Sequence, residues 1–118
     1  MEIGELLYVT TPAEFRRWLR KNHAVKKEIW LVQYKKATGK PTLNLEAATE
    51  EALCYGWIDS YVKGMDAERY ATRFTPRRPR SNWTETNRKL ALRLIEEGRM
   101  TKAGKAALPA DLQAGTEL

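Results

Sequence analysis

Hydrophobic residues in the first half of the chain recur with two periods, one typical of helices and one typical of buried strands. After a short extended segment at 5–9, Thr11 and Glu14 stand at the spacing of a capping box with a proline between them. We therefore predict a helix that runs to about Asn22. Aromatic and β-branched residues at 28–36 cover both faces of an extended segment, which predicts a strand inside a sheet.

The middle of the chain predicts a second helix and then a β-hairpin. Residues 45–55 place leucine and alanine on one helical face, and Gly56 is typical of the position just past a helix end. The segments 57–63 and 69–75 flank a loop with glycine and aspartate, as in an antiparallel hairpin. Matching the hydrophobic side chains across it predicts these opposed pairs: Val62 with Tyr70, Ile58 with Phe74, Trp57 with Thr75, and Asp59 with Arg73.

The last third predicts one long helix and one short helix. Ser81 is expected to cap the long helix, which runs to about Glu97, and Thr101 is expected to cap the short one. Residues 109–118 are expected to form a loose C-terminal end. Together these elements predict an α+β fold, with a small, mainly antiparallel sheet of three to four strands packed with three to four helices.

Composition places these elements in one domain, residues 1–118. Hydrophobic residues make up 42% of the chain and charged residues 31%, which is typical of a globular protein. No run approaches the roughly 20 apolar residues of a membrane helix, and no export signal stands at the N-terminus, so we expect a cytoplasmic protein. The net charge of +6 favours anionic partners, which include small molecules, acidic protein surfaces and nucleic acid.

The sequence contains no motif for a cofactor, and we expect neither a cofactor nor a metal. One cysteine and one histidine cannot form an internal disulfide or a zinc site. Cys54 is expected to be a small core residue, although a nucleophile with His23 as its base is the alternative. His23 follows a basic helix end, where it is expected to act as a C-terminal cap.

The block RFTPRRPRSNW, residues 73–83, holds four arginines, two prolines and a tryptophan. The prolines restrict the backbone, so the arginines are expected on a stiff connection between strand and helix. If Ser81 starts the helix, these cations crowd the positive end of its dipole. A phosphate or carboxylate held by Arg77, Arg78, Arg80 and Ser81 would relieve that conflict. The alternative is that acidic side chains of the protein relieve it.

Five further residues complete the predicted ligand site. Asn87 lies on the stripe of Trp83, Leu90 and Leu94, so its amide is expected among core residues, bonded either to a loop backbone or to a ligand. Trp57 and Asp59 belong to the GWID stretch before the hairpin. The predicted ligand-binding residues are Arg77, Arg78, Arg80, Ser81, Trp83, Asn87, Trp57, Asp59 and Arg73, with none assigned as catalytic.

The blocks GWID (56–59), RFTPRRPRSNW (73–83) and EGRMTKAG (97–104), with Asn87, resemble the YdeI/OmpD-associated (OmdA-like) family of bacteriocin-protection proteins. The resemblance extends over about residues 6–108. It implies a role in resistance to bacteriocins and cationic antimicrobial peptides, and it supplies no catalytic residues.

Three functions are compatible with these features. The first is a non-enzymatic stress or antimicrobial-resistance domain that binds an anion at the Arg-Pro block. The second is nucleic-acid binding by the same arginines, with the steep salt dependence that phosphate contacts impose. The third is a small enzyme that uses Asp59 or Cys54.

Overall fold

Four strands and five α-helices make up the part of the chain that the computed structural model describes, residues 1–78 and 82–114. The strands are β1 (Leu6–Leu7), β2 (Ile29–Tyr34), β3 (Trp57–Gly64) and β4 (Arg69–Pro76). The helices are α1 (Pro12–Asn22), the 3-10 helix η1 (Lys36–Thr38), α2 (Leu45–Cys54), α3 (Glu85–Glu96), α4 (Lys102–Ala106) and α5 (Ala110–Ala114). The predicted α+β fold is confirmed. Across the described residues, no helix has the length and apolar character needed to span a membrane.

The strands form one mixed sheet in the order β1-β2-β4-β3, in which only the β1–β2 pair is parallel. The inner strand β2 is buried on both faces, as its sequence predicts. Ile29 and Leu31 belong to the main core, whereas Trp30 and Val32 are buried on the opposite face. Trp30 there contacts the ring of Tyr61, with ring centroids 6.4 Å apart. Residues 29–33 of β2 are therefore buried on both faces of the sheet and are not exposed to a ligand.

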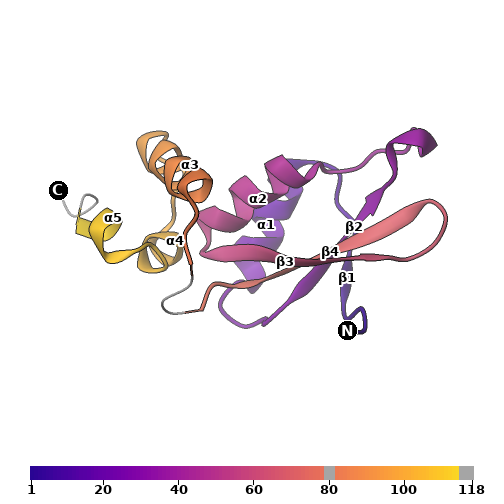
Figure 1. The fold of residues 1–118 in the computed structure, drawn as a ribbon, viewed down its shortest axis with the longest axis horizontal. Helices are drawn as coiled ribbons and strands as arrows, with labels where there is room; N and C mark the ends of the chain where they lie inside the picture. Colours follow the sequence, from indigo (N-terminus) through magenta and orange to yellow (C-terminus); the bar gives the residue numbers. More distant parts are fainter. Residues whose placement is uncertain (79–81, 115–118) are drawn as a thin grey trace.

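Helices α1 and α2 lie together on one face of the sheet, and α3, α4 and α5 are grouped beyond one end of it (Figure 1). The predicted capping box at the start of α1 is present: the Thr11 hydroxyl accepts the Glu14 N–H at 3.2 Å, and the Glu14 carboxylate accepts the Thr11 N–H at 3.1 Å. Buried residues of α1, α2, α3 and three strands form one core cluster. The C-terminal helices thus share the core with the sheet.

The predicted hairpin forms, but its predicted register is wrong. Val62 lies opposite Thr72, Ile58 opposite Thr75, Trp57 opposite Pro76, and Asp59 opposite Phe74. In the turn, the Asp66 carboxylate accepts the N–H groups of Glu68 and Arg69. Next to this turn the observed register differs from the predicted one by two residues. Beyond an irregularity between Asp59 and Tyr61 the difference is one residue. Because a one-residue slip exchanges the faces of a strand, Asp59 and Arg73 are not partners.

Helix α3 begins later than predicted. Its N-cap is Thr84, whose hydroxyl accepts the Asn87 N–H at 3.1 Å, and Glu85 follows in the first turn. Ser81, the predicted cap, lies outside the described residues. Arg77 and Arg78 precede the cap by six residues or more, so the predicted crowding at the helix dipole does not arise from them. Trp83 also precedes the helix and is not part of the predicted helical stripe.

A network of ion pairs attaches the C-terminal helices to α1 and α2. Glu51 of α2 is only 5% exposed and accepts hydrogen bonds from Arg16 of α1 at 3.1 Å and from Arg99 at 2.6 Å. Arg16 also donates to the Arg99 carbonyl at 2.9 Å. Next to it, Thr101 caps α4 as predicted, and both its N–H and its hydroxyl donate to the Cys54 carbonyl. These contacts fix the position of α4, which forms one side of the site described below.

Candidate functional site

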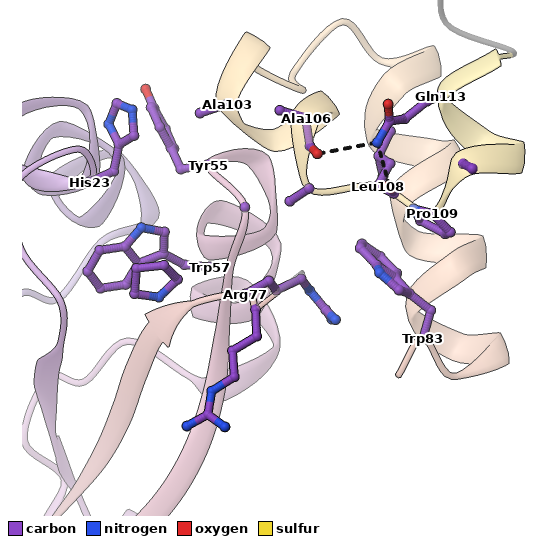
Figure 2. Close-up of a pocket in the computed structure, with 15 residues that line it drawn as sticks. His23, Tyr55, Trp57, Arg77, Trp83, Ala103, Ala106, Leu108, Pro109 and Gln113 are labelled. Carbon is purple, nitrogen blue, oxygen red and sulfur yellow. Dashed lines mark hydrogen bonds between the residues drawn. The ribbon is translucent and has the colours of Figure 1, made fainter. Parts of the chain in front are cut away.

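A cleft of about 700 Å³ lies where the end of the sheet meets the C-terminal helices (Figure 2). Its volume is in the range of small-molecule sites in proteins. We refer to it as the cleft. Its lining residues are His23, Tyr55, Gly56, Trp57, Pro76, Arg77, Arg78, Trp83, Ala103, Ala106, Ala107, Leu108, Pro109, Ala110 and Gln113.

One wall of the cleft consists of rings that the fold holds rigidly. Trp57 is 2% exposed and packs edge-on against Trp18 at 5.7 Å between ring centroids. Tyr55 is 6% exposed and lies 5.0 Å from the ring of His23. His23 is the predicted C-terminal cap of α1, and its Nδ1 donates to the Leu19 carbonyl at 2.9 Å. Neighbouring residues therefore fix the position of all three rings.

The opposite wall is made of small side chains on α4, on α5 and on the turn between them. Gly56 allows this wall to approach: its φ is +76°, and an added Cβ would lie 3.0 Å from the Ala103 carbonyl oxygen. Residues 110–114, placed by the sequence in a loose end, form α5. Gln113 of α5 donates to the Leu108 carbonyl at 2.6 Å and to the Ala106 carbonyl at 3.3 Å (Figure 2). An ion pair between Arg88 and Asp111 attaches α5 to α3.

Arg77 places a cation inside the cleft. Its backbone N–H donates to the Gly56 carbonyl at 2.8 Å, which fixes the residue at the end of β4. Its guanidinium lies over the ring of Trp83, with Cζ 3.8 Å from the ring centroid. Burial lowers the pKa of Arg77, and the negative charge of Asp59 opposes that change. The cleft thus holds a guanidinium that is partly removed from water.

The structure brings together four of the predicted ligand-binding residues: Trp57, Arg77, Arg78 and Trp83. Arg78 is the exposed member of this group. Arg80 and Ser81 lie outside the described residues. The structure places the other three predicted residues, Asp59, Arg73 and Asn87, away from the lining of the cleft.

Arg73 and Asp59 do not form the predicted ion pair. The Arg73 Nε donates to the Glu28 carboxylate at 2.6 Å, and its guanidinium also contacts the Ser60 hydroxyl at 3.4 Å. Asp59 lies opposite Phe74, and its negative charge opposes the lowering of the Arg77 pKa. For Arg73, therefore, an acidic side chain of the protein itself pairs with the arginine, as in the alternative to ligand binding.

Asn87 lines a different groove, between α2 and α3, with a volume of about 580 Å³. Its backbone N–H is bonded to the Thr84 hydroxyl, so the residue is part of the cap of α3. Glu50 and Arg93 form an ion pair at 3.0 Å in this groove. The prediction that Asn87 shares a site with Arg77 is wrong.

The residues that the sequence did not indicate come mainly from the opposite wall. Tyr55 adjoins GWID, and Ala103 lies within EGRMTKAG, so both are next to blocks that the sequence singled out. Pro109 and Gln113 carry no such signal, because their place in the cleft depends on how the C-terminal helices fold back.

Cys54 has the properties of a core residue. It is fully buried, and burial raises the pKa of its thiol, although Arg16 opposes that change. Because the thiolate is the reactive form, a buried thiol with a raised pKa is inert. In the described residues no group of three or more histidine, cysteine, aspartate or glutamate side chains could hold a metal ion.

We expect Cys54 to remain unmodified for hours in the native protein with a thiol-reactive chromogenic disulfide at pH 8, and to react fully within minutes in guanidinium chloride. Absorbance of the released thiolate measures both rates. Fast labelling of the native protein would instead support the enzyme hypothesis that uses Cys54.

Neither the curated proteins nor the solved structures include a match to the chain. One family model matches residues 7–107, which includes Trp57, Arg77, Trp83 and part of the C-terminal wall of the cleft. That match covers most of the 118 residues, and the chain therefore belongs to the family described as "Domain of unknown function (DUF8412)".

Proposed function

We propose that this protein is a non-enzymatic binding domain that holds an anionic ligand in the cleft. The observation that carries the proposal is the position of Arg77, a partly buried cation stacked on Trp83 inside a cavity of ligand size. The N–H groups of a guanidinium lie in its own plane as a fork, the geometry that suits carboxylate and phosphate oxygens.

The electrostatics of the cleft favour an anion. Burial destabilises the charged form of Arg77, and a negative group beside it would offset that cost. Arg78 adds a second, exposed cation at the same lining. No aspartate or glutamate is among the described residues that line the cleft. The net charge of +6 would also attract anions over distance.

The same lining favours binding over catalysis. A general base or nucleophile must lie within reach of the bound molecule. Of the described residues in the lining, His23 is the one histidine, cysteine, aspartate or glutamate, and its Nδ1 is bonded to the helix backbone. Asp59 and Cys54, the two residues proposed for an enzyme, do not line the cleft.

We expect inorganic phosphate to raise the melting temperature of the protein and the double variant R77Q/R78Q to lose that effect. At ten times the dissociation constant, binding stabilises a protein by about 1.4 kcal/mol, or about 5 °C for a domain of this size. Differential scanning fluorimetry at constant ionic strength, with chloride replaced by phosphate, measures the change. The matched control is R17Q/R20Q, which removes two exposed arginines from α1 and lowers the net charge equally.

An equal phosphate effect in R77Q/R78Q and in R17Q/R20Q would show that net charge, not the cleft, attracts the anion. Nucleic-acid binding is the competing proposal, and it predicts an affinity for duplex DNA that falls steeply with salt and depends on exposed arginines in general. Fluorescence anisotropy of a labelled duplex at two salt concentrations distinguishes the two. A role in bacteriocin or antimicrobial-peptide resistance, implied by the sequence resemblance, stays a prediction.

A further inference from the structure

We propose that the ligand of the cleft is a small aromatic anion, a planar ring whose carboxylate lies against Arg77 and whose body lies between the two walls. This inference rests on the proposed function and names its ligand class. The residues of the two walls support the aromatic ligand class, whereas anion binding depends on the arginines alone.

The rings of the aromatic wall are held in place by their neighbours. Trp57 and Tyr55 are almost fully buried, and the rings of Trp18 and His23 pack against them. The Arg16 guanidinium lies 5.4 Å from the centroid of the Tyr55 ring and holds it further. Aromatic rings pack favourably against other aromatic rings in edge-to-face or offset geometry. A ligand ring therefore gains more at this wall than an aliphatic body of the same size.

The facing wall consists mainly of small side chains. Ala103, Ala106 and Ala110 end in a methyl group and leave room for a ligand, and the longer Gln113 side chain is bonded to the Ala106 and Leu108 carbonyls. Gly56 holds α4 close to the aromatic wall, since any larger residue there would meet the Ala103 carbonyl. Fixed aromatic rings that face small apolar side chains favour a planar aromatic body over a puckered ring or a bent chain of the same size.

Arg77 and Trp83 fix the position of the charged group. The guanidinium lies over the Trp83 ring inside the cleft, on the same lining as Trp57 (Figure 2). A carboxylate in the plane of the guanidinium accepts two parallel hydrogen bonds, and the ring attached to it then extends toward the walls. One polar contact at the edge and an apolar body inside is the usual composition of a small-molecule site.

The test compares benzoate with cyclohexanecarboxylate, which has the same charge and a similar size but a puckered ring. Isothermal titration calorimetry of the full chain should give an affinity for benzoate about fivefold or more higher than for cyclohexanecarboxylate or acetate. In the variants A106L and A110L, a branched side chain enters the cleft from an exposed position. Both should weaken benzoate about tenfold and leave phosphate binding within twofold. A13L, at the opposite end of α1 from His23, is the control.

Equal affinities for benzoate and cyclohexanecarboxylate, with phosphate binding that still requires Arg77 and Arg78, would overturn the aromatic ligand class and leave the proposed function standing. The same holds if A106L and A110L melt like the wild type and bind benzoate unchanged. If neither phosphate nor benzoate shows binding that R77Q/R78Q removes, the proposed function itself fails, and the inference fails with it.

Discussion

Replacing Gly104 with alanine should lower the free energy of unfolding by about 3 kcal/mol, because the added methyl group would overlap backbone atoms that cannot move aside. A Cβ at this position would overlap the Cys54 carbonyl oxygen and would lie 2.8 Å from the carbonyl carbon. The Met100 sulfur, at 2.5 Å, belongs to a flexible side chain and could shift. The Cys54 carbonyl cannot, since it accepts two hydrogen bonds from Thr101.

Two opposing effects meet in this substitution, and their magnitudes decide its sign. Alanine favours a helix over glycine by about 1 kcal/mol, so G104A gains that much in α4. Overpacking costs about 1–3 kcal/mol or more, and displacing α4 also weakens the two Thr101 hydrogen bonds at about 1 kcal/mol each. The overlap therefore outweighs the helix preference.

Denaturant unfolding followed by tryptophan fluorescence measures the effect of G104A, and the melting temperature should fall by about 10 °C. The control is G64A at the end of β3, where an added Cβ meets nothing within 4 Å. G64A should stay within about 0.5 kcal/mol of the wild type. A G104A protein as stable as the wild type would mean that α4 does not pack against the Cys54 carbonyl as closely as the structure shows.

Features set by neighbouring residues were predictable from the sequence. The capping box of Thr11 and Glu14 depends on two side chains three residues apart, and it formed as predicted. The caps at Thr101 and His23 are equally local. For α3 the predicted cap was Ser81, whereas the hydroxyl that caps the helix is that of Thr84, three residues later.

Features set by distant residues were not predictable. The hairpin register depends on the irregularity at Ser60 beside Arg73, and Arg73 pairs with Glu28, which is 45 residues away in the sequence. The cleft shows the same division. Trp57, Arg77 and Trp83 were singled out from their own sequence blocks. The opposite wall, on α4 and α5, faces them only because α4 packs against Gly56. Arginine content thus indicated the site but gave no information on its shape.

The second large effect is expected at Glu51, where E51Q should lower the free energy of unfolding by about 3 kcal/mol. Breaking a buried ion pair by removing one charge costs about 3–5 kcal/mol. The lower end applies because the partners, Arg16 and Arg99, keep 27% and 31% of their side chains exposed and can regain water. Glutamine keeps the shape of the side chain, so the loss reports on charge and hydrogen bonding. The control E97Q removes an exposed carboxylate that also pairs with Arg99 and should change stability little.

E51Q should also affect the cleft, although Glu51 does not line it. Glu51 connects α1, α2 and the segment before α4 through its hydrogen bonds with Arg16 and Arg99. Loss of its charge should therefore allow the opposite wall of the cleft to move away from Tyr55 and Trp57. In the proposed binding mode, phosphate contacts Arg77 and Arg78, whereas the body of an aromatic anion also contacts both walls and depends on their spacing. We therefore expect E51Q, at a temperature where it stays folded, to weaken benzoate binding more than phosphate binding. Calorimetric titration of both anions into E51Q and E97Q measures this, and equal weakening of the two would show that wall spacing does not control the site.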